Sequence, residues 1–208
     1  MVDDIRLADV LRTHGARATF NLNSGHHENA RSRPWKYKGE KEVWRLALGE
    51  LREAYQGFTI ANHSVSHPWP TRIPLETWRS EVLDGRKWLQ DFFGAPVLGF
   101  AYPFGDFNEA TADVVREAGH VYGRTVRNAT PCYPPADPAA FHPDCHFRAA
   151  DFWERHAAAK ASGTGVFYFW GHSYELITEA DWQAFEAQIA RLSADADTVW
   201  TELPELFV

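Results

Sequence analysis

The chain has no long apolar run. No stretch of its 208 residues approaches the roughly 20 consecutive apolar residues that span a bilayer. Cysteine is scarce as well, because Cys132 and Cys145 are its only two, too few for a disulfide scaffold. The first residues, from Met1 to Arg6, start acidic and do not follow the pattern of a signal peptide. These features predict a cytoplasmic protein with reduced thiols.

Basic residues are also fewer than acidic ones. The 21 lysines and arginines are outnumbered by 28 aspartates and glutamates, which gives a net charge of −7. No basic cluster interrupts this acidic balance. Nucleic acid and anionic membranes are therefore not expected as partners, while the oligomeric state stays open.

Aromatic residues are abundant, with nine Trp, seven Tyr and fourteen Phe. Such side chains stack on sugar rings, but they also fill cores, and we expect most of them in the core. The overall balance of 45% hydrophobic and 24% charged residues is ordinary for a globular protein. Length and composition together predict that residues 1–208 form a single domain.

Helical and strand-like segments alternate along the chain. Helices are expected from Asp4 to Gly15, through Val43 to Ala54, and over 74–93, 108–118, 151–161 and 178–192. Strands are expected over 18–22, 58–61, 97–101, 121–126, 166–170 and 198–200, with polar or proline-rich loops at 23–42 and 127–147. Strands separated by helices pair in parallel, which predicts an α/β fold. The series opens on a helix, whereas a barrel of strand–helix units should open on a strand, so we expect residues 1–208 to lack the first strand of such a barrel.

Several of the expected strands end in polar clusters. These are Asn21 and Asn23, then His63 and His67, then the segments 102–106 and 172–175. Parallel α/β folds place their ligand sites at the carboxyl edge of the strands. We therefore expect these clusters to meet in one site.

His63 and His67 form the most informative cluster. They follow the β-prone run 58–61 and precede Pro68. A four-residue spacing brings two side chains to the same side of a turn. Two neutral imidazoles at a strand end suit a borderline divalent ion such as zinc. The alternative is a pair of surface histidines without a ligand.

Four segments in order resemble the polysaccharide deacetylase superfamily, the NodB-homology domain of carbohydrate esterase family 4 and its relatives. His63-Ser64-Val65-Ser66-His67 resembles the family's paired-histidine motif. The other three segments, which resemble its second strand, its third motif and the motif with the catalytic histidine, are 18–23, 100–105 and 170–176. The resemblance implies a distorted (β/α) barrel of about seven strands and metal-dependent hydrolysis of N-acetyl or related acyl groups on a carbohydrate.

Roles for individual residues follow from the same resemblance. His63, His67 and an aspartate would hold a divalent metal, usually zinc, and His172 would be the general acid that protonates the leaving amine. The backbone N–H near Phe104 would stabilise the oxyanion. Carbohydrate contacts are implied for Tyr102, Trp170 and Tyr174. Asp106 and Glu175 flank motif residues, and that position favours a role in holding an imidazole. For His172 the alternative is a strand-end histidine bonded to a neighbouring carboxylate.

Two features depart from the family pattern. Its first motif, Asp-Asp-Gly at the end of the first strand, supplies the catalytic base and the third metal ligand. Asp3 and Asp4 are followed by Ile5 and adjoin the first expected helix, so the alignment places this motif before Met1. We interpret Asp4 as a helix N-cap instead. At Ala101 many members carry an arginine that orients the base.

Other polar residues have less specific patterns. His26 and His27 lie in a loop after the first expected strand, from which they can approach the site, but we expect them at the surface. Asp144, Cys145 and His146 end the proline-rich loop and can supply a substitute metal ligand or a substrate contact, or be plain loop residues. Two alternative functions also stay open. One is a catalytically impaired carbohydrate-binding relative, and the other is a hydrolase of a small cyclic amide or ureide.

Overall fold

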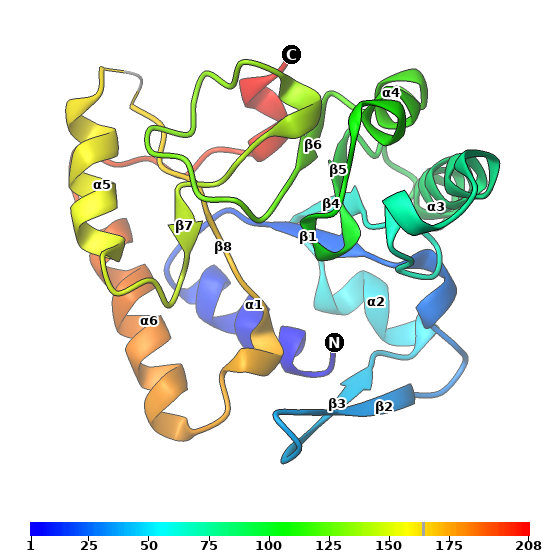
Figure 1. Cartoon of the computed structure of the whole chain (residues 1–208). Helices are drawn as coiled ribbons and strands as arrows, with labels where there is room; N and C mark the ends of the chain where they lie inside the picture. Colours follow the sequence, from blue (N-terminus) through cyan, green and yellow to red (C-terminus); the bar gives the residue numbers. More distant parts are fainter. Residues whose placement is uncertain (164) are drawn as a thin grey trace. The chain divides into compact units, whose positions relative to one another are not determined.

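The computed structural model describes residues 1–163 and 165–208 (Figure 1). The chain divides into two compact units. Unit 1 comprises Met1–Phe20, His26–Ile60 and His172–Leu206, and unit 2 comprises Asn21–Gly25, Ala61–Gly171 and Phe207–Val208.

Unit 1 is built mainly from helices and one hairpin. Its elements are α1 (Asp3–Thr13), β2 (Ser32–Tyr37), β3 (Lys41–Arg45), α2 (Leu48–Ala54), α6 (Glu179–Ser193) and the short 3-10 helices η5 (Ser173–Glu175) and η6 (Leu203–Leu206). Helices α1, α2 and α6 match the helices expected there, except that α2 begins later than expected. Thr178 accepts a hydrogen bond from the backbone N–H of Asp181 at 3.1 Å, which is the cap predicted for α6.

The hairpin of β2 and β3 replaces an expected loop and the start of an expected helix. The two strands pair antiparallel, with Trp35 opposite Val43. Lys38 and Gly39 both have positive φ, 51° and 76°, as a tight hairpin turn requires. Val43 is fully buried while Trp44 is 37% exposed, the alternation of a strand with one covered face. The prediction of a helix through Val43 was therefore wrong.

Unit 2 contains the parallel sheet. Strands β1 (Thr19–Leu22) and β4 (Thr59–Asn62) contribute their carboxyl-terminal halves, and β5 (Gly99–Ala101) and β6 (Tyr122–Arg124) follow in the order β1-β4-β5-β6. Asn62 pairs with Phe100, and Ala101 pairs with Arg124. The α/β class with parallel strands is confirmed. The described strands pair as parallel sheets of four and two strands plus the hairpin.

Helices α3 (Leu75–Phe93) and α4 (Glu109–Glu117) pack beside this sheet (Figure 1). Gly94 ends α3 in the left-handed conformation, with φ of 71°, as expected from the sequence. The core between helices and sheet is formed by apolar side chains from both, which include Trp78, Val82, Phe100, Tyr102, Val114 and Val115.

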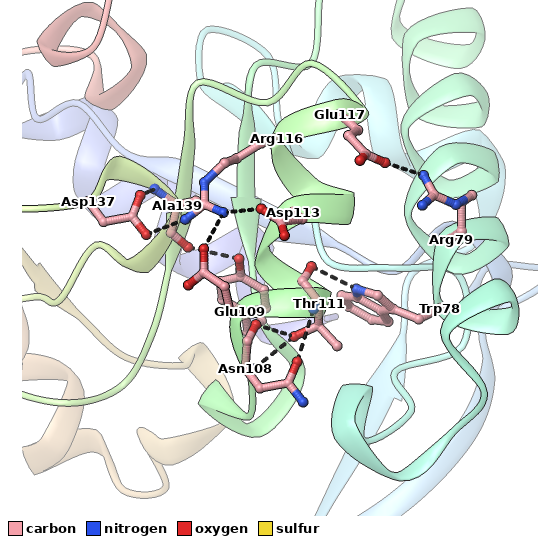
Figure 2. A network of polar contacts seen from close by, with 11 residues as sticks. Trp78, Arg79, Asn108, Glu109, Thr111, Asp113, Arg116, Glu117, Asp137 and Ala139 are labelled. Atoms are coloured by element: carbon pink, nitrogen blue, oxygen red, sulfur yellow. Dashed lines mark hydrogen bonds and ion pairs between the residues drawn. The ribbon is translucent and has the colours of Figure 1, made fainter.

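A polar network fixes α4 at both ends (Figure 2). Asn108 caps the helix by accepting the N–H of Thr111 at 3.0 Å, and Trp78 of α3 donates to the Thr111 carbonyl at 3.1 Å. Further along, Arg116 binds three carboxylates, those of Glu109, Asp113 and Asp137. Because α4 follows the loop after β5 directly, this network anchors one side of that loop.

The remaining elements of unit 2 are α5 (Phe152–Ala161), β7 (Cys145–His146) and β8 (Phe169–Trp170). Strand β8 pairs in parallel with β7 and is shorter than the expected strand over 166–170. The proline-rich loop offers only two residues as a partner, and the Tyr168 N–H donates to the Asp144 carboxylate at 2.7 Å instead. The strand expected over 198–200 is wrong, since these residues form none and Val199 is 86% exposed.

Within the described part of the chain, every helix falls short of the length or apolar character needed to cross a membrane.

Candidate functional site

The turn after β4 brings His63 and His67 of unit 2 together. The His63 N–H continues the sheet by donating to the Leu22 carbonyl at 3.0 Å. Ser64 and His67 then adopt positive φ, 67° and 60°, and the His67 N–H donates to the Ser64 hydroxyl at 3.1 Å. The two imidazole rings end with their centroids 4.7 Å apart. This sharp turn places both rings on one side, as the spacing predicts.

The orientation of His63 is fixed by β5. Its Nδ1 lies 2.6 Å from the Ala101 carbonyl oxygen, and since a carbonyl only accepts, Nδ1 carries the proton. The lone pair of the neutral ring is then on Nε2, the arrangement found in metal-bound histidines.

The donor set of two imidazoles therefore fits part of a zinc coordination shell. The described residues of unit 2 add no third histidine, cysteine or carboxylate to this pair.

A second loop of unit 2, η3 (Pro103–Gly105), contacts His67. Phe104 has a φ of 59° and packs its ring 4.5 Å from that of His67. On its other side it stacks on Trp69 at 4.0 Å, with an angle of 5° between the planes. The Arg72 guanidinium lies 4.1 Å from the Trp69 ring centroid. A ladder of four side chains thus ends on a candidate metal ligand.

Hydrogen bonds join the same two loops. The N–H of Thr71 donates to the Asp106 carboxylate at 2.9 Å, and its hydroxyl donates to both carboxylate oxygens. We call the four residues Trp69, Thr71, Phe104 and Asp106 the loop clamp. Asp106 was expected to hold an imidazole, whereas its described bonds go to Thr71. Its contribution is to hold the two loops together.

Two aromatic residues expected to contact carbohydrate differ in their surroundings. Tyr102 is 1% exposed and donates its hydroxyl to the Ala139 carbonyl at 2.8 Å. Burial raises its pKa far above the ordinary value. Tyr102 is thus a core residue, which leaves its ring no face for a substrate. Trp170 is half-buried and packs edge-on against His146 at 4.9 Å.

Unit 1 contains the third group of expected site residues. His172 stacks on Tyr174 with ring centroids 4.7 Å apart. Glu175 accepts the backbone N–H of His172 at 3.1 Å, and its other oxygen lies 3.5 Å from His172 Nδ1. Tyr174 also packs edge-on against Trp35 and Tyr37 of the hairpin, at 4.9 and 5.0 Å. Burial raises the pKa of Tyr174, so this phenol stays neutral and is available to donate a hydrogen bond.

Asp4 is not an N-cap, contrary to the expectation. Helix α1 begins at Asp3, and the Asp4 side chain is buried. Its two oxygens accept hydrogen bonds from Tyr55 at 2.6 Å and Ser173 at 2.5 Å, and it also contacts the Met1 ammonium. Burial alone raises the pKa of this carboxyl, but the ammonium and the two hydroxyls outweigh it and lower the pKa. Unit 1 therefore holds a buried carboxylate whose partner Ser173 follows His172.

Comparison with known proteins settles the relationship of the chain. The family model for polysaccharide deacetylase matches residues 4–123, more than half of the sequence. The chain belongs to the polysaccharide deacetylase family. The matched region contains His63 and His67, while His172 lies beyond it.

A curated relative of this polysaccharide deacetylase family member is similar to part of the chain. A peptidoglycan-N-acetylglucosamine deacetylase from Bacillus cereus is 28% identical over 91 residues, which cover 40% of the chain and 42% of that protein. The chain thus spans less than half the length of this curated relative.

Two solved structures resemble the fold of the family member over 99% of its length, both with a TM-score of 0.59. One is a family 4 carbohydrate esterase from Streptomyces lividans, solved in complex with acetate. It is 15% identical in sequence, and the match covers 88% of its chain. The other is a CE4 family pseudoenzyme from Bacillus anthracis, which is 16% identical and matched over 60% of its chain. At this identity the likeness shows the fold.

Three residues of this family member were not predicted from its sequence. Trp69 and Arg72 lie two and five residues after His67, and this proximity to the paired histidines is the only sequence feature that points to them. Arg124 ends β6 opposite Ala101, and only the strand pairing reveals this. His27 was expected at the surface, but it is partly buried in unit 1, where its Nδ1–H donates to the Leu46 carbonyl at 2.9 Å and burial lowers its pKa.

The polar residues that end the proline-rich loop, Asp144, Cys145 and His146, lie in unit 2 of the family member. Asp144 is fully buried, and Cys132 and Cys145 are buried free thiols. Burial raises the pKa of Asp144 and of both thiols. Asp144 and the two thiols therefore serve the packing of the loop and are closed to a ligand from solvent, whereas His146 is only half-buried.

Proposed function

We propose that this protein is a zinc-dependent hydrolase that removes N-acetyl or related acyl groups from a carbohydrate, and that residues 1–208 form one deacetylase-like domain. The single observation that supports it best is the pair of imidazoles, His63 and His67, with His63 Nδ1 held by the Ala101 carbonyl. A neutral imidazole anchored through Nδ1 presents Nε2 to a metal. Membership in the family supports a carbohydrate substrate.

His63 and His67 would hold the ion. A bound zinc ion supplies Lewis-acid polarisation of a carbonyl and a water of lowered pKa. Further donors are needed for a tetrahedral shell, and a carboxylate is the ligand class expected for them. The loop clamp keeps His67 in position, since Phe104 packs against its ring.

The other proposed roles belong to residues of this chain that bind, orient or carry protons. The N–H at Phe104 is proposed to donate to the developing oxyanion, because its left-handed backbone is fixed by the stack on Trp69. His172 is proposed to protonate the leaving amine, oriented by Glu175. Tyr174 and Trp170 are proposed to contact the sugar, for which flat aromatic faces are suited.

The test measures acetate released by the 208-residue chain. The chain is stripped of metal, reloaded with zinc and incubated with N-acetylglucosamine oligomers or with peptidoglycan, and acetate is quantified. We expect release that depends on zinc and is lost in His63→Gln. A zinc-loaded chain that releases no acetate from either substrate contradicts the proposal.

A second candidate is a catalytically impaired relative that binds carbohydrate. It is favoured by the donor set, because the described residues of unit 2 supply two metal ligands and no third. Likeness to a pseudoenzyme of the same fold is consistent with it. Oligosaccharide binding by a chain that retains no zinc after dialysis, measured by elemental analysis, would select this candidate.

A further inference from the structure

Three residues on adjacent strands of unit 2 form a row across the carboxyl end of the sheet. Asn62 pairs with Phe100, so the next residues, His63 and Ala101, are level with each other, and Ala101 pairs with Arg124. Side chains at one level of a parallel sheet point to the same face. Arg124 therefore emerges on the face of the sheet that carries His63.

The residue between His63 and Arg124 in this row is the small Ala101. With neighbouring strands about 4.8 Å apart, the Cα atoms of His63 and Arg124 are roughly 10 Å apart. Ala101, whose side chain is only a methyl group, stands between the two. The same residue, Ala101, holds His63 through its carbonyl. Arg124 thus starts from the same row and the same face of the sheet as the candidate metal ligand His63.

The charge of Arg124 is buried without a matching anion. The residue is 6% exposed, and its guanidinium lies 5.0 Å from the ring centroid of Trp170. Its terminal nitrogens donate to the Thr125 carbonyl, at 3.3 Å, and to the Tyr168 side chain, while Nε is buried and has no hydrogen-bond partner. No aspartate or glutamate among the described residues forms an ion pair with it. A buried charge is costly unless an opposite charge meets it.

We propose that Arg124 binds a carboxylate beside His63 and His67. Guanidinium and carboxylate match in shape and charge, and their paired hydrogen bonds are among the strongest in proteins. The inference rests on the proposed function for the source of this anion. Hydrolysis of an N-acetyl group releases acetate, and an acidic sugar carries a carboxylate of its own.

The experiment measures binding of carboxylates to the full chain by isothermal titration and by NMR. The probes are acetate, glucuronic acid as a carboxylate-bearing sugar, and neutral N-acetylglucosamine as the control. Arg124→Met removes the positive charge, and Arg124→Lys keeps the charge but lacks the paired N–H donors of a guanidinium. Arg79→Met is the matched control, because Arg79 is paired with Glu117 on the helix surface.

We expect acetate or glucuronic acid to bind with an affinity that falls at least about tenfold in Arg124→Met, partly recovers in Arg124→Lys and is unchanged in Arg79→Met. Tighter binding of acetate identifies the product as the source, and tighter binding of glucuronic acid identifies an acidic sugar. If Arg124→Met does not fold, the Nε–H resonance of Arg124, assigned by its absence in Arg124→Lys, must shift when the carboxylate is added to the unmodified chain.

Equal affinity of Arg124→Met and the unmodified chain, or no binding of either carboxylate, overturns the inference. The outcome is separable from that of the proposed function. Binding through Arg124 without acetate release from any sugar leaves the carboxylate site standing and contradicts the deacetylase. Acetate release together with carboxylate binding that does not depend on Arg124 supports the deacetylase and overturns the carboxylate site.

Discussion

The carbonyl oxygen of Ala101 lies 2.6 Å from Nδ1 of His63. A backbone atom of β5 thereby sets the tautomer of a side chain on the next strand, and the nitrogen left for a ligand is Nε2. Because the contact is made by the backbone, it does not depend on which side chain stands at position 101.

The first prediction concerns zinc affinity. His67→Gln removes one of two imidazole donors, so we expect affinity to fall by more than the roughly 10- to 100-fold that loss of an outer partner costs. Competition with a coloured chelator measures it. His142→Gln is the control, since His142 is bonded to Thr125. Equal affinities of the two variants would exclude His67 as a ligand.

The second prediction separates catalysis from metal binding. His172→Asn keeps a side chain of similar polarity but cannot protonate a leaving amine, so we expect kcat to fall roughly 10²- to 10⁴-fold with unchanged zinc content. His14→Asn is the matched control, because His14 is paired with Glu186 elsewhere in unit 1. Activity retained by His172→Asn would argue for a purely local role of this histidine.

The third prediction is a pH dependence of stability that is due to Asp4. Its pKa is lowered in the folded state, so its contribution is complete above the ordinary carboxyl pKa of 3.8 and is lost as the pH falls through the folded value. We expect Asp4→Asn to lower the free energy of unfolding by about 2 kcal/mol at neutral pH. Below pH 3.8 the difference should shrink.

Urea unfolding at a series of pH values measures both effects. Asp9→Asn is the control, because Asp9 lies on the same helix and forms an exposed pair with Arg12. A constant difference between Asp4→Asn and the unmodified chain at every pH would show that the carboxylate charge contributes nothing.

The fourth prediction tests the loop clamp. Trp69→Ala removes the ring that stacks on Phe104, which should cost about 1 kcal/mol of stability and weaken zinc affinity about tenfold through His67. Trp69→Phe preserves a stacked ring and should retain most of both. Chemical unfolding and chelator competition give the two numbers. A stability loss with unchanged zinc affinity would mean that the clamp supports the loops without positioning His67.

The fifth prediction compares two glycines in open surroundings. Gly94 has a φ of +71°, and a Cβ there would meet nothing within 4 Å, so Gly94→Ala tests backbone strain alone. We expect a loss of about 1 kcal/mol. Gly49 in α2 is equally open but without positive φ, so Gly49→Ala should stabilise by about 0.5 kcal/mol. Thermal unfolding of both variants measures the two effects, and equal signs would contradict this account.

Features that depend on a few neighbouring residues could be predicted from the sequence. Asn108 and Thr178 cap their helices as expected, and Gly94 ends α3. The convergence of His63 and His67 also follows from a four-residue spacing in one turn. The hairpin at 32–45 was missed because its exposed strands alternate weakly, and its turn residues, Lys38 and Gly39, carry no strong signal.

What the sequence by itself determined is the α/β class, most helix boundaries, the paired histidines and the resemblance to a family, because each depends on spacing along one segment. Only the tertiary structure decided the rest. It shortened the strand at 166–170 for want of a partner, buried Tyr102 and Asp4, stacked Trp69 on Phe104, and set Arg124 level with His63. These outcomes depend on which strands pair and at what register, and the free energy of such long-range contacts is not written in any single segment.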